Sequence, residues 1–265
     1  MKRIKQTLMV GAVLGLLALF PSAGEAGMDR EKFLKDPGVY GTFAVFQVDE
    51  EWWKLDKAAK VAAVSEVKAI FQKHSDALIA DTYLLRGLVE NADVLVRIHS
   101  LEILTNQNFL IDFMGTALGQ HLKNTYTFNG LTKAVNYVPG MSEDLKIALK
   151  TQTDPGPKPY AIIVPIRKDA EWWNAGQDVR TAMMKEHTEA TVPYLKTVKR
   201  KLYHASGLDD VDFITYFETA KLDDFNNLII ALEKVKENRH NKQFGAPTLL
   251  GTIRPLDEIL DILSH

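Results

Sequence analysis

Two residues in the second half of the chain have types and positions that could do chemistry. His187 lies on a mostly apolar stripe of a helix expected at residues 177–194, and Arg200 lies between Val198 and Leu202 on one face of a strand expected at 197–204. A histidine can bind a metal ion or a haem iron, whereas a buried guanidinium keeps its charge and needs an anion or a carboxylate beside it. The pair is a first indication of a site for a metal or haem and an anionic substrate.

Purely structural explanations stay open for both residues at this point. A single helical histidine is more often a core or surface residue than a ligand, and no His-x-x-x-His pair surrounds this one at zinc spacing. Arg200 could instead form a buried ion pair with Asp212 or Glu218. Its neighbours Lys199 and Lys201 are expected to face solvent along the strand edge.

Two acidic residues and a lysine could support His187. Glu233 and Glu237 lie on the helix expected at residues 223–238, and either could accept a hydrogen bond from the far nitrogen of His187. Such a bond would make the imidazole a better donor to a metal, but the spacing does not choose between the two carboxylates. Lys168 could reach a carboxylate of a cofactor. In each case the simpler alternative is a solvated surface residue.

Other residues could line a pocket around these groups. Thr215 and Phe217 would share a face of the next strand and could border the same cavity as Arg200. Trp172 and Trp173 could pack against a flat macrocycle, although tryptophans in a protein core are commoner. The sequence contains no glycine-rich phosphate loop, nucleophile elbow or kinase signature.

The elements expected to position these residues follow the order β-α-β-β-α-β twice. The first set comprises strands at residues 39–48, 77–88, 93–99 and 125–138, with helices at 56–73 and 101–122. The second comprises strands at 160–166, 197–204, 212–218 and 248–253, helices at 177–194 and 223–238, and a tail helix at 256–263. The tripeptide Glu-Trp-Trp follows the first strand of each set, at residues 51–53 and 171–173. This repeat predicts an internal duplication of a ferredoxin-like unit.

We therefore predict an α+β fold in which two ferredoxin-like units form a dimeric α+β barrel within one chain. Helices would cover one face of each sheet, and the other faces would pack together around an interior that could hold a flat cofactor. A segment rich in proline and glycine at residues 139–159 divides the chain into an N-terminal half, 27–150, and a C-terminal half, 151–265. The first half has Val67 near the place of His187 and no arginine matching Arg200, so the site is expected in the second half.

Residues 1–26 have the features of a cleavable secretory signal peptide. Lys2, Arg3 and Lys5 precede an apolar run at residues 8–20, and Gly24 and Ala26 fit the small-residue positions of a cleavage site. The protein is thus expected to be exported, into the periplasm if the host is a diderm bacterium, with no membrane segment left after cleavage. An uncleaved anchor is the alternative.

The overall composition narrows the classes of function. With 32 basic and 34 acidic residues and a formal net charge of -2, the 265-residue chain lacks the basic character of nucleic-acid-binding proteins. It contains no cysteine, which excludes disulfides, thiolate metal sites and the covalent haem attachment of c-type cytochromes. Any ligand to a metal or haem must therefore come from other side chains.

Three stretches of the second half resemble a known protein family. They are YAIIVPIRKDAEWWN, MMKEHTEATVPYLKTVKRKLYHASGLDDVDFITYFET and VKENRHNKQFGAPTLLGT. They are similar to chlorite dismutase, specifically to its long-chain pentameric branch, and the resemblance spans essentially the whole mature chain. It implies a duplicated ferredoxin-like barrel, one non-covalent haem b per subunit, a homopentamer, and an enzyme that converts the small anion chlorite into chloride and dioxygen.

The resemblance also implies roles for individual residues. His187 would be the proximal iron ligand, Glu237 the carboxylate hydrogen-bonded to it, and Arg200 the distal arginine. In the expected mechanism, oxygen transfer from chlorite gives a ferryl species and transient hypochlorite, which Arg200 retains until the O–O bond forms. The other residues of the haem pocket would be Lys168, Trp172, Leu202, Thr215 and Phe217, with Tyr137 on the side of the haem propionates.

Other functions stay open on sequence grounds. A coprohaem decarboxylase of haem biosynthesis has the same fold, but its distal arginine is typically replaced, so Arg200 and the export signal argue against it. A periplasmic haem-binding protein without turnover is the alternative from another class. A peroxidase is disfavoured because no distal histidine or aspartate is evident as its acid–base group.

Overall fold

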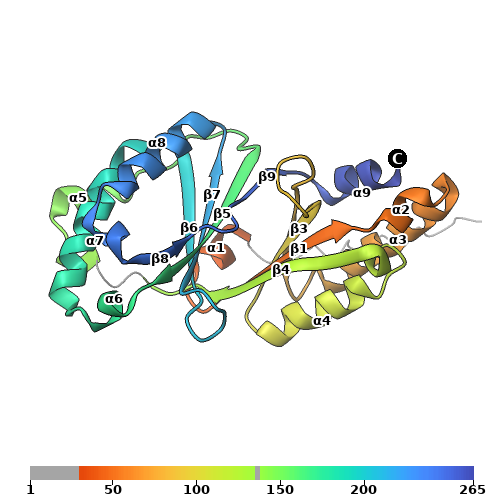
Figure 1. Cartoon of the computed structure of the whole chain (residues 1–265), viewed down its shortest axis with the longest axis horizontal. Coiled ribbons are helices and arrows are strands. Elements are labelled where there is room, and N and C mark those ends of the chain that lie inside the picture. Colours follow the sequence, from red (N-terminus) through yellow and green to blue (C-terminus); the bar gives the residue numbers. More distant parts are fainter. Residues whose placement is uncertain (1–29, 135–137) are drawn as a thin grey trace, which may run out of the picture.

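The two halves of the chain form two copies of the same sheet (Figure 1). The computed structural model describes residues 30–134 and 138–265, so the expected signal peptide and Tyr137 lie outside the described residues. The antiparallel strand order is β4-β1-β3-β2 in the first half and β9-β5-β7-β6 in the second. Counted within its own half, and leaving out the short edge strand β8, each order is 4-1-3-2, which agrees with the predicted duplication of a ferredoxin-like unit.

The observed elements have the following bounds. The strands of the first half are β1 (Tyr40–Val48), β2 (Ile79–Leu84), β3 (Val94–Ser100) and β4 (Leu122–Leu131). Those of the second are β5 (Tyr160–Lys168), β6 (Val198–His204), β7 (Phe213–Thr219), β8 (Asn241–Phe244) and β9 (Leu249–Ile253). The α-helices are α1 (Arg30–Lys35), α2 (Glu50–Lys54), α3 (Lys57–His74), α4 (Ile103–Met114), α5 (Glu143–Ala148), α6 (Ala170–Asn174), α7 (Gln177–Thr191), α8 (Leu222–Glu233) and α9 (Leu256–Ser264). The 3-10 helices are η1 (Gly119–His121), η2 (Val138–Gly140), η3 (Val192–Tyr194) and η4 (Lys236–His240).

The two sheets join at both edges and close into a barrel. Tyr83 and Leu84 of β2 pair with β9, and Leu131 of β4 pairs with His204 of β6. Because β5 pairs with both β9 and β7, the strand pairings form an unbroken ring. The predicted α+β barrel within one chain is confirmed.

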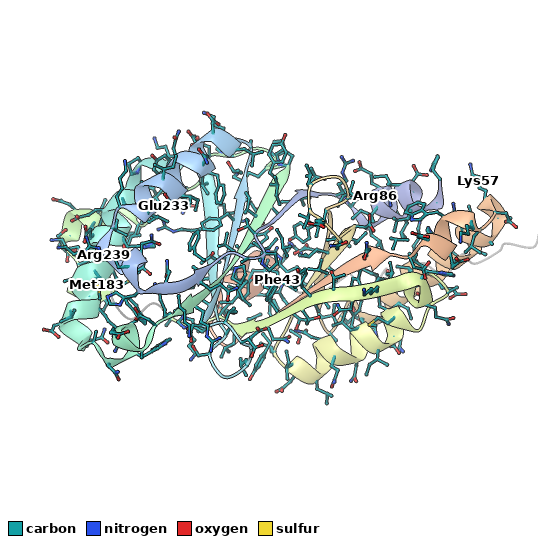
Figure 2. The ribbon with its side chains drawn as sticks, viewed as in Figure 1. Phe43, Lys57, Arg86, Met183, Glu233 and Arg239 are labelled. Atoms are coloured by element: carbon teal, nitrogen blue, oxygen red, sulfur yellow. The ribbon has the colours of Figure 1, made fainter. Side chains whose placement is uncertain are left out.

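The interior of the barrel is filled by side chains from both sheets. Phe43 lies between the two halves (Figure 2), and its ring meets that of Tyr203 edge to face at 5.1 Å. Tyr83 and Tyr216, one from each half, are also buried in this core. The expectation that the barrel interior holds a flat cofactor is wrong, because these aromatic side chains occupy the space.

The helices of the first half pack closely on the outer face of their sheet. Val67 of α3 and Phe109 and Phe113 of α4 are buried there. The tail helix α9 returns from the second half and lies beside α2 and α3 (Figure 1), where the indole of Trp52 donates to the Leu263 carbonyl at 2.8 Å. Residues from the second half therefore complete the core of the first. No helix in the described part of the chain is long and apolar enough to cross a bilayer.

Several boundaries differ from those expected from the sequence. The helix expected at residues 101–122 ends at Met114, with Gly115 as its C-cap, and η1 follows. The helix expected at 223–238 ends at Glu233, and the separate 3-10 helix η4 follows it. Strand β8 was not predicted, because its four residues, NKQF, lack the β-branched residues that mark strands.

A buried arginine ties the two sheets together. The Arg97 side chain on β3 is 4% exposed, lies 3.8 Å from the ring centre of Tyr216, and donates to Asp81 at 2.8 Å. Burial alone would raise the pKa of Asp81, but the charges of Arg97 and Arg30 hold it below its usual value. Asp81 belongs to the same half as Arg97, whereas Tyr216 and Glu218, whose Oε1 lies 3.9 Å from the guanidinium, belong to the second half. Arg97 therefore links the two halves.

We expect Arg97→Ala to lower the free energy of unfolding by about 3 kcal/mol or more, because it breaks a buried ion pair and leaves a cavity beside Tyr216. Arg86→Ala is the matched control. Arg86 also pairs with an aspartate, Asp93, and stacks over Trp53, but its side chain is 46% exposed. Its loss should cost about 1 kcal/mol. Urea denaturation measures both variants, and equal losses would contradict the role given to Arg97.

Candidate active site

A cavity of about 760 Å³ lies between the second sheet and the helices that cover it. It is therefore outside the barrel, and its volume is within the range of cofactor sites. Its sheet wall is formed by β5, β6 and β7, and its helix wall by α6, α7 and α8. The sheet wall carries Ile166, Arg200, Leu202, Thr215 and Phe217, and the helix wall carries Trp172, Met184, His187, Thr188 and Leu228.

The two halves differ in what fills the layer between sheet and helices. In the first half, Phe109 and Phe113 of α4 stack at 6.1 Å, and both rings contact Phe71 of α3. In the second half, α8 contributes the smaller Leu228 and Leu232, and α7 contains no phenylalanine, tyrosine or tryptophan. Phe225 of α8 packs on Phe217, but the second layer has no counterpart of this three-ring cluster, and it stays open.

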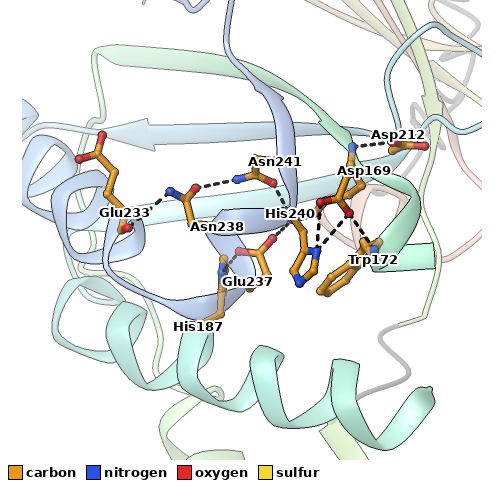
Figure 3. Close-up of polar contacts among 10 residues, drawn as sticks. Asp169, Trp172, His187, Asp212, Glu233, Glu237, Asn238, His240 and Asn241 are labelled. Carbon is orange, nitrogen blue, oxygen red and sulfur yellow. Dashed lines mark hydrogen bonds and ion pairs between the residues drawn. The ribbon is translucent and has the colours of Figure 1, made fainter. Parts of the chain in front are cut away.

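His187 on α7 borders this cavity and is held by Glu237. Its Nδ1 lies 3.1 Å from Glu237 Oε2 (Figure 3), and because a carboxylate only accepts, Nδ1 carries the hydrogen and Nε2 keeps the lone pair. Burial, helped by the charges of Arg200 and Lys168, lowers the pKa of His187 to about 4. The imidazole is therefore neutral at neutral pH, which is the form that binds metals.

The Glu237 carboxylate is itself buried and held from a second side. Lys168 Nζ contacts Glu237 Oε1, donates to Asn241 Oδ1 at 2.6 Å, and lies 4.6 Å from the ring centre of Trp172. The side chains of Lys168 and Glu237 are 3% and 10% exposed. Burial lowers the pKa of Lys168 to about 8, although nearby aspartates act in the opposite direction. A histidine and a lysine thus share one buried carboxylate.

The backbone explains why Glu237 rather than Glu233 contacts His187. Helix α8 ends at Glu233, whose side chain is exposed, whereas Glu237 is buried in the 3-10 helix η4. Asn238 donates to the Glu233 carbonyl at 3.5 Å and accepts from Asn241 at 2.7 Å (Figure 3). These bonds fix the turn between α8 and β8 that directs Glu237 towards α7.

Arg200 lies on the sheet wall, and its surroundings differ from the expectation. Val198 is buried on the same strand, but Arg200 and Leu202 are exposed to the cavity. The predicted burial of this face is wrong at these two positions, because the fully buried residue of β6 is Tyr203, on the face that packs inside the barrel. Asp212, one carboxylate considered as a partner of Arg200, accepts a backbone amide of β5 at 2.7 Å.

The lysines on either side of Arg200 differ from each other. Lys199 is exposed and pairs with Glu218, the other carboxylate considered for Arg200, at 3.1 Å. Lys201 is half-buried and donates to the carbonyl of Leu34 on α1. Burial and the charge of Arg97 lower the pKa of Lys201 to about 8. The prediction that Lys201 faces solvent is therefore wrong, since it is packed against α1.

The structure brings the other described residues named from the sequence to the same cavity. Trp172 and Phe217 are buried at its border, and Leu202 faces it. Thr215 also lines it, with Oγ1 donating to the Val164 carbonyl at 2.9 Å. Tyr137 lies outside the described residues, so its predicted place on the propionate side stays a prediction.

Several cavity residues on α7 were missed from the sequence. The predicted apolar stripe ran through Met183, which is buried but does not line the cavity. The cavity residues of α7 are spaced three and four residues apart, and this spacing was the available signal. Most of them are polar, however, so they do not form an apolar stripe. The stripe that borders the cavity is Gln177, Thr181, Met184, His187 and Thr188.

The donor set fits a metal carried in a macrocycle better than a bare ion. Among the described residues, no group of three or more histidine, aspartate or glutamate side chains could enclose a metal ion. The cavity instead offers neutral His187, held by Glu237, together with apolar walls and the positive charges of Lys133, Arg180 and Arg200. These features suit a haem, which takes one axial histidine and carries carboxylates.

Comparison with known proteins identifies the family. A sequence model of the chlorite dismutase family matches residues 60–254. The chain belongs to the chlorite dismutase family. It is 41% identical over 239 residues to the chlorite dismutase of Ideonella dechloratans, a match that covers 89% of this chain and 84% of the relative. The resemblance seen in the sequence is confirmed.

Solved structures show the same relationship. A chlorite dismutase from Candidatus Nitrospira defluvii, in complex with imidazole, is 53% identical, with a TM-score of 0.88 over 90% of this chain and 100% of that one. A haem-binding protein from Thermus thermophilus has a TM-score of 0.71 over 87% of this chain and 96% of its own, but is only 17% identical. That second likeness shows a shared fold alone.

We expect Lys168→Met to lower the free energy of unfolding by about 3 kcal/mol, because the Glu237 carboxylate would stay buried without the ammonium beside it. Lys199→Met is the control, since it removes an exposed contact with Glu218 and should cost less than about 1 kcal/mol. Denaturation of both variants without cofactor at neutral pH measures the difference. Similar small losses would mean that the Lys168 contact does not stabilise the site.

Proposed function

We propose that this protein is a haem b-dependent chlorite dismutase that converts chlorite into chloride and dioxygen. Membership of the family supports the reaction, and the cavity supports the cofactor. The observation that carries the proposal is the pairing of the two walls: neutral His187, held by Glu237, on the helix wall, and cationic Arg200 on the sheet wall. One cavity thereby offers a ligand for iron and a fixed charge for a small anion.

The described residues can hold a haem without a covalent link. His187 would bind the iron, while Arg180 and Lys133 would supply positive charge for the haem carboxylates. The absence of cysteine excludes covalent c-type attachment and so supports a non-covalent haem such as haem b. When bound, the haem iron would supply the redox chemistry by which chlorite loses both oxygen atoms as dioxygen. The apolar side chains that would hold the ring include Ile166, Trp172, Leu202, Phe217 and Leu228.

The residues behind His187 set its strength as a ligand. By accepting the Nδ1 hydrogen, the Glu237 carboxylate increases the electron density of the imidazole and makes Nε2 a better donor. Lys168 contacts the other oxygen of the same carboxylate and favours its ionised form. The imidazole and the carboxylate together would make His187 a firm ligand for the haem iron.

Arg200 acts on the substrate. Its guanidinium cannot lose its charge under ordinary conditions, so it attracts chlorite and offers planar N–H donors to its oxygen atoms. Conversion of chlorite into chloride and dioxygen balances without external electrons or protons, so the cavity needs no acid–base residue. Arg200 would also hold transient hypochlorite in the cavity, which protects Met184 and Trp172 on the facing wall from oxidation.

The direct test is to add chlorite to the purified protein with haem and to measure dioxygen and chloride. We expect equal amounts of both products, formed catalytically. Stable haem without oxygen release would favour the haem-binding alternative. Loss of carboxylate groups from bound coprohaem would favour the decarboxylase alternative. Either result would contradict the proposal.

We expect Arg200→Ala to bind haem like the parent but to lose about 10- to 100-fold in kcat/KM for chlorite, since charged hydrogen bonds are worth roughly 1.5–3 kcal/mol. Its haem should also bleach faster during turnover, because hypochlorite escapes from the cavity. Arg200→Lys keeps the charge without the planar donors, so its kcat/KM and its rate of haem bleaching should lie between those of the parent and Arg200→Ala. Oxygen-electrode kinetics and haem absorbance measure these effects, and parent-like turnover and survival of Arg200→Ala would disprove the role.

We also propose that the protein is exported to the periplasm and forms a homopentamer. The composition of residues 1–26 supports export. Exposed apolar side chains on and beside α4, namely Leu101, Leu104 and Ile111, support self-association, because such side chains commonly mark interfaces. N-terminal sequencing of the exported protein, expected to begin at Gly27, and its mass by sedimentation equilibrium test the two points.

A further inference from the structure

An aspartate, a tryptophan and a histidine make the same contacts in each half of the fold. In each half, the aspartate carboxylate accepts a hydrogen bond from the tryptophan backbone N–H and another from the histidine Nδ1. These distances are 2.9 and 3.0 Å in the first half, and 2.8 and 3.1 Å in the second. In both halves, the backbone N–H of the aspartate also donates a hydrogen bond to the backbone carbonyl of the histidine, at 2.9 Å. We call each set an Asp–His clasp. The first consists of Asp49, Trp52 and His121, and the second of Asp169, Trp172 and His240 (Figure 3).

Both clasps contain an ionised carboxylate. The hydrogen bond from the Trp172 amide lowers the pKa of Asp169, and burial, which opposes it, does not reverse the effect. Burial would raise the pKa of Asp49, but hydrogen bonds from its own clasp lower it below the usual value. Each histidine Nδ1 must therefore carry the hydrogen that the carboxylate accepts. The histidine and tryptophan rings lie 5.6 Å apart in the first clasp and 6.0 Å in the second.

The residues around the two clasps differ in a way that points to the cofactor. Equivalent positions are 120 residues apart near the aspartates, as 49 and 169 are, and 119 apart near the histidines, as 121 and 240 are. Around the first clasp these positions belong to the apolar core and are Val48, Val67, Leu118 and Leu122. Around the second they are Lys168, His187, Glu237 and Asn241. The clasp is therefore part of the repeated unit, and only its second copy adjoins a polar site.

The second clasp connects the two backbone segments that meet at Glu237. His240 is the last residue of η4, the 3-10 helix that contains Glu237. Asp169 directly follows Lys168, the last residue of β5, whose ammonium contacts the Glu237 carboxylate. The indole of Trp172 lies against the same ammonium. A bond between Asp169 and His240 therefore limits how far η4 can move from β5, and with it the position of the carboxylate.

We propose that Asp169 and His240 are positioning residues that set where the Glu237 carboxylate meets His187 Nδ1. The inference rests on the proposed function for the iron that His187 would bind, whereas the clasp and its contacts belong to the protein alone. Without the clasp, η4 would move away from β5 and the Glu237–His187 bond would weaken. The imidazole would then be a poorer donor, which should speed the loss of haem and raise the reduction potential of its iron.

The first clasp provides a matched control within the same chain. His240→Ala and His121→Ala each remove the imidazole–carboxylate bond of one clasp in the holoprotein, and both should lower its thermal midpoint. Only His240→Ala should increase the rate of haem dissociation, by about 10-fold, and shift the reduction potential upwards. Transfer of haem to an excess of apomyoglobin measures the rate, and spectroelectrochemistry measures the potential. His240→Asn should restore both towards the parent, because its amide nitrogen can replace Nδ1 as donor to Asp169.

The pair Asp169→Asn and Asp49→Asn gives the same comparison with isosteric changes that keep an oxygen at the helix N-cap, in case the alanine variants fold poorly. Equal haem loss from variants of the two clasps would show that a general loss of stability is responsible. Parent-like dissociation and potential in His240→Ala would show that the clasp does not position Glu237. Either result overturns the inference. A parent that binds no haem or releases no dioxygen would overturn the proposed function instead, so the two failures are distinct.

Discussion

The second half of the molecule depends on one buried carboxylate that two donors share. Glu237 comes from η4, His187 from α7 and Lys168 from β5, so three separate elements must converge on it. A buried charge is tolerated only with such partners. This requirement accounts for the local backbone. Helix α8 has to end early, η4 has to turn back, and β8 has to pair with β5 to hold the turn in place.

Duplication explains how a stable barrel can support an open cavity on its outer face. Both halves keep the same strand order and the same Asp–His clasp, but they use the layer between sheet and helices differently. In the first half, aromatic rings such as Phe109 and Phe113 close this layer, whereas in the second it stays open. The first half and the barrel interior are closely packed with apolar side chains. This packing stabilises the fold, so the second half can keep a cavity for a ligand in place of part of its own packing.

Local patterns predicted the fold well, and the site only in part. The repeated Glu-Trp-Trp sequence predicted the duplication, and the helix expected at residues 56–73 is α3, Lys57–His74, with Asp56 as its N-cap. Alternation along β6 separated Arg200 from Tyr203, but it could not say which face enters the barrel, because that depends on the partner sheet. Helical periodicity likewise could not choose between Glu233 and Glu237 as the partner of His187, since the end of α8 is set by tertiary contacts. Lys201 was misjudged because α1 lies far away in the sequence.

The return of α9 to the first half has a consequence for the order of events during synthesis. Trp52 and Val67 belong to a buried cluster that is completed only by residues of α9, such as Leu260 and Leu263. The ribosome delivers the whole second half before it delivers this helix. The first half therefore cannot complete its hydrophobic core as an independent unit while the chain is emerging. Its final packing therefore has to wait for the segment that follows the cofactor-binding half.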